Sequence, residues 1–472
     1  PNSVLSNLPV PRVPVFGTHC LPVTGVAPGP YTMTRGADHG GAVMRYAAAS
    51  RLLLLSLSSL WRVAASPYDT SAPLNLSCLS SSTSGATSSL SPLWPSVAAA
   101  VEGSIVWDSV YFVRIAQCGY EYEQNYAFLP LLPIAISILS RTVFSPLIPL
   151  VGHRAVLGLS GYVLNNVAFV LSALYLYRLS VKILKDSKAA FRASILFCFN
   201  PASIFYSSIY SESLYSLFSI GGLYYFLSGA SNAAMFCFAL SGSARSNGIL
   251  NAGYFCFQTL HKSYDAIFLK RRASLAVQVL ILGALRCLCI FSPFIAFQAY
   301  GYYNICARSR SVEMRPWCKA RPPLLYNFIQ SHYWGVGFMR YFQLKQLPNF
   351  LLASPILLLS FCSIVHYVKA RPEIVLSLGF RSFYVEEQSA AAGPVSSDPS
   401  PDSGHFPDKS RATIYQAVGY SLRRRKQKPK PNNLGGASLV EMGYLSAAVL
   451  PFVLHLGFMT DHRHFWSCTC RW

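Results

Sequence analysis

Long apolar stretches recur along the chain and are separated by short polar segments. A helix needs about 20 apolar residues to cross a bilayer, so these stretches predict membrane-spanning helices. We expect spans at 153–176, 190–210, 213–229, 274–300, 349–368 and 439–460. A further span is expected at 232–257, although a polar run at 241–248 interrupts it.

Two apolar segments are less regular. Residues 127–149 contain four prolines, so we expect a bent or re-entrant element that crosses incompletely. Near the start, Arg45 and Arg51 precede four leucines and small residues follow, a pattern typical of either a first span or a signal peptide. The pattern as a whole predicts an all-α polytopic membrane protein, a helix bundle with about eight or nine spans.

The composition agrees with a membrane protein. Of the 472 residues, 52% are hydrophobic and 12% are charged, whereas a soluble domain carries about a quarter charged residues. The net charge of +21 comes from basic residues that alternate with apolar stretches and form no single face. The composition therefore excludes an ordinary soluble enzyme and argues against a nucleic-acid partner.

The basic clusters predict the orientation of the chain. Clusters at 182–192, 262–272 and within 369–438 indicate cytosolic loops by the positive-inside rule. We therefore expect two large lumenal loops, at 67–126 and 301–348. Asn75 begins an N-glycosylation sequon in the first of them, which agrees with this orientation.

The ends of the chain and its cysteines give weaker signals. We expect a multi-span domain at 41–459, an unassigned or artefactual segment at 1–40 and an aberrant tail at 460–472. Most of the thirteen cysteines lie inside predicted spans, where they act as small apolar residues. Cys306 and Cys318 share one predicted lumenal loop, so a disulfide between them and two free thiols are equally expected.

The few carboxylates gather before the 127–149 segment. Four of the eighteen acidic residues are Glu102, Asp108, Glu121 and Glu123. Residues 105–116 predict an amphipathic helix at the membrane surface, which makes Asp108 either a functional carboxylate or the N-cap of a helix beginning at Ser109. The two nearby glutamates suit a divalent ion or a plain polar loop, and the absence of an Asp-x-Asp pair argues against a metal.

Two other groups carry candidate chemistry. Glu212 opens a predicted span, as a functional carboxylate or as a charge favoured by the helix dipole. Arg245 lies within an apolar stretch, where it can bind a lipid phosphate or extend to the headgroups. Aromatic residues crowd 321–350 and predict a second interfacial helix that stacks on sugars or rests in headgroups.

Several motifs resemble the PIG-V family of GPI mannosyltransferases (GPI mannosyltransferase 2), in the same order along residues 43–459. In the first half the matching residues are Trp107-Asp108, Phe112, Ile115-Ala116, Gly119-Tyr120, Glu123, Ala127-Phe128, Pro130, Pro133, Pro201, Phe205, Tyr210-Ser211-Glu212 and Arg245-Ser246-Asn247-Gly248. In the second half they are Pro316-Trp317-Cys318, Tyr326, Ile329-Gln330, Tyr333-Trp334, Val336-Gly337-Phe338, Leu344-Lys345-Gln346 and Pro348-Asn349-Phe350. Relative to the family we expect a missing final span beyond Met459, and 1–40 has no recognised counterpart.

The resemblance implies a GT-C glycosyltransferase of the endoplasmic reticulum with a lumenal active site. It would transfer the second, α1,6-linked mannose from dolichyl-phosphate mannose to the GPI precursor, with inversion and without a metal or other cofactor. An inverting transfer needs one base, and the resemblance assigns that role to Asp108, positioned by Trp107. A small accessory membrane subunit is a further expected partner.

The remaining predicted substrate-binding residues follow from the same motifs. Arg245 and Lys345 are candidates for the donor phosphate, and Tyr333 and Trp334 for packing against sugar or lipid. The others are Glu123, Glu212, Asn247 and Gln346. The alternatives are another dolichol-dependent GT-C mannosyltransferase and a non-catalytic membrane transporter or scaffold. A transporter needs polar residues at mid-span, whereas the acidic residues here gather at one edge.

Overall fold

The computed structural model describes residues 39–65, 78, 91–308, 315–337, 340, 343–380 and 449–461, and all of these lie in one compact unit. The regular elements in these ranges are helices, which confirms the all-α class. The longer helices are α1 (Gly40–Ala64), α2 (Pro95–Glu102), α3 (Asp108–Cys118), α4 (Leu131–Arg141), α6 (His153–Leu184), α7 (Ser187–Cys198), α9 (Glu212–Leu227), α10 (Ser231–Ala244), α11 (Ala252–Tyr264), α12 (Ala273–Tyr302), α13 (Leu325–His332), α14 (Leu347–Ala370) and α17 (Leu450–Asp461). Shorter helical turns are η2 (Glu123–Ala127), η3 (Ser145–Leu147), α5 (Ile148–Val151), α8 (Ser203–Ser207), η4 (Ser246–Asn251), η5 (Asp265–Leu269), η6 (Tyr303–Ala307), η7 (Pro316–Lys319), η8 (Leu344–Gln346) and α15 (Pro372–Leu376).

Three of the described helices are long and apolar enough to cross a membrane: His153–Leu184, Ala273–Ala307 and Leu344–Ala370. A fourth candidate is the pair Leu131–Arg141 and Ser145–Val151, which is bent by 67°. The bend agrees with the expectation for the proline-rich 127–149 segment. The expected count of eight or nine spans is not confirmed, because α7, α9, α10, α11 and α17 are only 12 to 16 residues long.

Two of the expected spans are divided in the structure. A single helix over 190–210 is wrong, because α7 ends at Cys198 and the chain restarts as the short α8 after Pro201. Proline lacks the N–H that continues a helix and disfavours helical backbone in the residue before it. The expected 232–257 span is likewise interrupted by η4, which separates α10 from α11.

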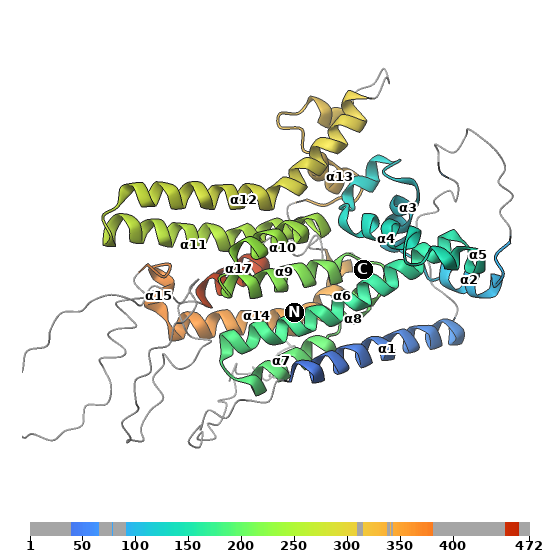
Figure 1. Cartoon of the computed structure of the whole chain (residues 1–472), viewed down its shortest axis with the longest axis horizontal. Helices are drawn as coiled ribbons and strands as arrows, with labels where there is room; N and C mark the ends of the chain where they lie inside the picture. Colours follow the sequence, from blue (N-terminus) through green and yellow to red (C-terminus); the bar gives the residue numbers. More distant parts are fainter. Residues whose placement is uncertain are drawn as a thin grey trace, which may run out of the picture. The chain divides into compact units, whose positions relative to one another are not determined.

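The bundle is built around α6 and α9, which run in the same direction, as the pairs Ser172–Ser216 and Tyr175–Tyr225 show. α9 packs against α6 on one side and α10 on the other, and α12 contacts both α10 and α11 (Figure 1). α1 lies along α6, α7 and α8. It buries Val43, Ala47, Ser50 and Arg51, which share one face of the helix at the spacing of an inward-facing stripe.

Arg51 is the polar centre of the contact between α1 and the break in the chain after α7. Its guanidinium donates to the carbonyls of Cys198 and Ser203 and to the hydroxyls of Ser203 and Ser207, at 2.9–3.1 Å. It also lies 3.8 Å from the centre of the Phe169 ring. The sequence suggested a cation flanking the leucine run, whereas the structure buries it among protein donors and acceptors. α1 is therefore packed into the bundle as an integral helix, although it is not among the described helices that are long and apolar enough to cross a membrane.

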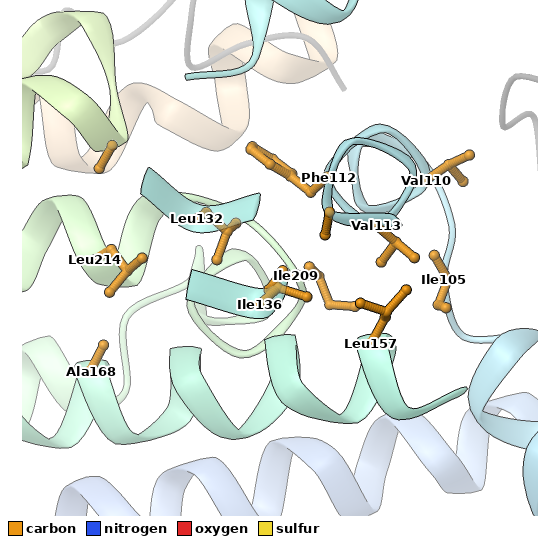
Figure 2. Packing of buried hydrophobic residues seen from close by; sticks show 12 residues of the cluster. Ile105, Val110, Phe112, Val113, Leu132, Ile136, Leu157, Ala168, Ile209 and Leu214 are labelled. Carbon is orange, nitrogen blue, oxygen red and sulfur yellow. The ribbon is translucent and has the colours of Figure 1, made fainter. Parts of the chain in front are cut away.

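A hydrophobic cluster holds α3 against the bundle (Figure 2). Val113 of α3 faces Ile209 and Leu157 of α6, and Ile136 of α4 belongs to the same cluster. Burying each such side chain stabilises the fold by about 1.5–3 kcal/mol. Seven of the eleven residues of α3 are buried, so this helix is packed largely within the protein. It therefore forms a rigid base for its first residue, Asp108.

Gly248 permits the close contact between η4 and α10, and it provides a test of this packing. A Cβ added there would lie 2.2 Å from the carbonyl carbon of Ser241, so the backbone would have to move. We expect Gly248→Ala to lower the thermal unfolding midpoint of the purified protein in detergent by several degrees, a cost of about 1–3 kcal/mol. Gly253→Ala is the matched control, because a Cβ at Gly253 meets nothing within 4 Å. Equal midpoints for the two variants would contradict the described packing.

Candidate functional site

An open pocket with a cavity volume of about 120 Å³ lies between α3, the start of α9, the end of α10 with η4, and α13. Five of the predicted site residues line it: Asp108, Glu212, Arg245, Asn247 and Trp334. Five polar residues that were not predicted as site residues line it as well: Tyr210, Ser211, Ser246, Tyr326 and Gln330. Residues from five separate parts of the sequence, within 108–112, 127–129, 210–212, 244–247 and 326–334, therefore converge on one cavity.

Asp108 enters this pocket from the first residue of α3. The preceding Trp107 has φ 59° and ψ −131°, a backbone conformation that costs a non-glycine residue about 1–3 kcal/mol. The turn is closed by the Ser109 N–H, which donates to the Val106 carbonyl at 3.2 Å. Because α3 begins at Asp108, Trp107 is the N-cap and the expected capping role of Asp108 is not what the structure shows. A carboxylate in the first turn is favoured by the helix dipole.

Two tyrosines lie beside the Asp108 carboxylate. Burial and the nearby negative charge of Asp108 both raise the pKa of Tyr210, and the same two causes raise the pKa of Tyr111. The backbone of Asp108 also hydrogen-bonds to the Tyr210 phenol. Both phenols therefore stay protonated at neutral pH and lie beside the Asp108 carboxylate.

A partly exposed ion pair forms another part of the pocket wall. Glu212, the first residue of α9, is paired with Arg245, which follows α10. Arg245 also lies 3.5 Å from the Ser211 hydroxyl. Their side chains are 24% and 18% exposed, so the pair is held in place and still reaches the cavity. The second carboxylate oxygen of Glu212 is buried and has no hydrogen-bond partner. The pocket thus presents a fixed cation near a fixed carboxylate.

Glu123 and Tyr333, both predicted to bind substrate, lie outside the pocket lining. Glu123 accepts hydrogen bonds from Trp317 Nε1 at 2.8 Å and Tyr333 Oη at 2.7 Å, and it lies 3.5 Å from Arg315. Burial and the hydrogen bond to Glu123 raise the pKa of Tyr333 to about 12, so this phenol remains a donor at neutral pH. The Glu123 carboxylate therefore attaches the 315–337 segment to η2. That segment also supplies Trp334, whose ring packs edge-on against Phe128.

A buried ion pair and two disulfides hold the rest of this region. Glu121 pairs with Arg114 at 2.6 Å, and both side chains are buried. Disulfides join Cys306 to Cys318, as the shared loop suggested, and Cys78 to Cys118 at the end of α3. Among the described residues one group has the spacing of metal ligands, namely Cys78, Cys118 and Glu121. Cys78 and Cys118 form a disulfide with each other, and Glu121 is paired with Arg114, so all three residues are engaged in contacts within the protein.

The remaining predicted residues do not line the pocket. Lys345 is exposed in η8 and Gln346 accepts a hydrogen bond from Asn349, while Trp107 shapes the backbone before Asp108. Asn75 lies outside the described residues. The added pocket residues had a signal in the sequence: Tyr210, Ser211, Tyr326 and Gln330 belong to the motifs that carry the family resemblance, although none was given a role.

Comparison with known proteins agrees with the motifs. A family model described as "Mannosyltransferase (PIG-V)" matches residues 40–467. The rat protein "GPI alpha-1,6-mannosyltransferase 2" is 31% identical over 361 residues, which cover 72% of this chain and 71% of the rat protein. The human protein of the same name is 32% identical over 303 residues, 58% of this chain and 60% of the relative. The Drosophila melanogaster "GPI mannosyltransferase 2" is 32% identical over 279 residues, 53% of this chain and 61% of the relative. No solved structure matches the chain.

The role of Glu123 as an attachment point can be tested by Glu123→Gln. The substitution keeps the size of the side chain but replaces a charged acceptor, and a hydrogen bond to a charged group contributes about 1.5–3 kcal/mol. We expect trypsin to cleave after Lys319 about tenfold faster in the variant, because the segment detaches more often. Glu102→Gln, from the same acidic group but outside this contact, is the control. Equal cleavage rates in the two variants would show that Glu123 does not hold the segment.

Proposed function

Because the chain belongs to the PIG-V family of mannosyltransferases, we propose that it transfers an α-1,6-linked mannose to a precursor of the glycosylphosphatidylinositol anchor. Membership of this family and the long apolar helices make it a membrane-embedded glycosyltransferase that acts on lipid-linked substrates. We assign the reaction to the pocket that is lined by Asp108 and by the Glu212–Arg245 ion pair.

In the proposed reaction, Asp108 is the base and dolichyl-phosphate mannose is the donor. The Asp108 carboxylate takes the proton from the acceptor hydroxyl as its oxygen bonds to the anomeric carbon of mannose. The bond from that carbon to the phosphate oxygen breaks, and its electron pair leaves with dolichyl phosphate. Attack from the side opposite the leaving group converts a β-linked donor into an α-linked product. Phosphate is a good leaving group, so the proposal includes no metal or other cofactor.

Arg245 is our candidate for the donor phosphate. A guanidinium binds phosphate oxygens in a forked geometry, and the pair with Glu212 holds it at the pocket wall in advance. Lys345, the other basic candidate, lies outside the pocket lining. Trp334 and Tyr326 offer aromatic surface on the α13 side of the pocket, which suits a sugar ring. In this proposal Asp108 acts on the acceptor hydroxyl and Arg245 binds the phosphate of the donor.

We place the reaction in the lumen of the endoplasmic reticulum. The basic runs at 182–192 and 262–272 favour the cytosol, and the loops that carry the pocket then face the opposite side. Two disulfides in these loops suit an oxidising compartment. A small accessory membrane subunit remains part of the proposal on the resemblance alone.

The base assignment is tested by Asp108→Asn. Loss of a general base typically lowers the rate about 10²–10⁴-fold, so we expect mannose transfer to fall at least a hundredfold. The assay is transfer of labelled mannose in membranes from cells that lack the second GPI mannose, with the one-mannose lipid accumulating as the second readout. Glu102→Gln should keep full activity at the same protein level. Full transfer by Asp108→Asn would remove Asp108 from the mechanism.

The phosphate assignment is tested by Arg245→Gln. Losing a bidentate charged contact should raise KM for the donor at least tenfold, because a hydrogen bond to a charged group contributes about 1.5–3 kcal/mol. Arg178→Gln, an exposed cation of α6, is the control. An unchanged donor KM in Arg245→Gln, together with a raised one in Lys345→Gln, would move the phosphate contact to Lys345.

A further inference from the structure

The chain between α8 and α9 runs without regular structure through the interior of the bundle. Its carbonyls, and those at the end of α8, are nevertheless bonded one after another over 206–210. The Tyr206 carbonyl accepts a hydrogen bond from Ser213 Oγ at 2.6 Å, and the Ser207 carbonyl accepts one from Asn166 Nδ2 at 3.3 Å. The Ser208 and Tyr210 carbonyls both accept hydrogen bonds from Asn165 Nδ2, at 2.5 and 2.8 Å. The Ile209 carbonyl accepts one from Ser109 Oγ at 3.3 Å. Five consecutive carbonyls therefore bind side chains, with donors that come from α3, α6 and α9.

Asn165 makes the most direct of these contacts. It is fully buried in α6, inside a helix long enough to span a membrane, and its single amide nitrogen bridges two carbonyls. Its own carbonyl oxygen is buried and has no hydrogen-bond partner. Burying an unpaired polar atom costs free energy, and a leucine would fill the same space without that cost. The contribution of the Asn165 amide to the structure is therefore the pair of hydrogen bonds that it donates to the Ser208 and Tyr210 carbonyls.

The carbonyls that Asn165 holds lead directly into the pocket. Tyr210, Ser211 and Glu212 are three consecutive lining residues, and the first of them carries one of the two bonded carbonyls. Between the two, Ile209 is bound by Ser109, the residue after Asp108. α6 also approaches so closely that a Cβ on Gly161 would lie 2.9 Å from the Ile209 side chain. One short stretch of backbone thus links α6, the base and the ion pair.

We propose that Asn165 is a positioning residue for the transfer: its amide holds backbone 208–210 and thereby places Tyr210 and Glu212 relative to Asp108. The inference rests on the proposed function. Asn165 does not line the pocket, so it acts through the backbone that it holds. Catalytic groups displaced by about 1 Å can lose about a hundredfold in rate, whereas substrate binding to the other walls is retained.

The experiment compares Asn165→Leu with Asn166→Leu in the full chain. The neighbouring Asn166 bonds Ser207, one residue farther from the pocket, so the same substitution there is a matched control. We expect kcat per folded protein to fall at least tenfold in Asn165→Leu, with KM for the acceptor changed less than twofold. Asn166→Leu should keep kcat within about twofold of the unchanged chain. Equal kcat values for the two variants would overturn the inference.

Asn165→Asp keeps the test decisive if the leucine variant does not fold. A buried, neutral carboxylic acid retains one donor, and an ionised one retains none. We therefore expect intermediate activity that decreases as pH rises from 6 to 9, relative to the unchanged chain. Unchanged activity at every pH would overturn the positioning role.

The same assay separates this inference from the function on which it rests. Transfer by the unchanged chain and its loss in Asp108→Asn test the function, while the ratio of the two asparagine variants tests the positioning role. If the unchanged chain transfers mannose and the ratio is one, the inference alone fails. If the unchanged chain transfers none, the function fails and the inference fails with it.

Discussion

The architecture depends on one constraint: backbone carbonyls that leave a helix inside the bundle must find donors within the protein. The chain breaks this way after α7, and the donors come from distant elements. Arg51 of α1 serves the first carbonyls of the break, and Asn165 and Asn166 of α6 and Ser109 of α3 serve the later ones. Because the donors come from three helices, α1, α3 and α6, satisfying this backbone also aligns those helices with one another.

The break is what makes a pocket between packed helices. The irregular segment after α8 leads into Tyr210 and the start of α9, which line the same pocket as Asp108. The same principle appears at Trp107, where an unfavourable backbone conformation is held because α3 is buried along most of its length. Both devices fix polar groups before any substrate arrives, which is the arrangement that electrostatic catalysis requires.

The sequence predicted the features that depend on local composition. Apolar runs predicted a helical membrane protein, prolines predicted the bend near 131–151, and the scarcity of acids drew attention to Asp108. It could not predict contacts made over long distances. The partners of Glu123 lie 194 and 210 residues away along the chain, so its attachment role left no local pattern. The position of Arg51 was predicted wrongly for the same reason. A basic residue next to a run of leucines is typical of the flank of a helix, and its actual partners lie far away in the sequence.

The position of Arg51 has a consequence for how the protein is made. Its acceptors begin 147 residues later in the sequence, so α1 leaves the ribosome long before they exist. At about 5–20 residues per second, the interval is about 7–30 s. During that time the Arg51 guanidinium lacks the carbonyl and hydroxyl partners that it has in the folded bundle. Assembly of this bundle is therefore not strictly sequential: α1 docks only after α8 has been synthesised.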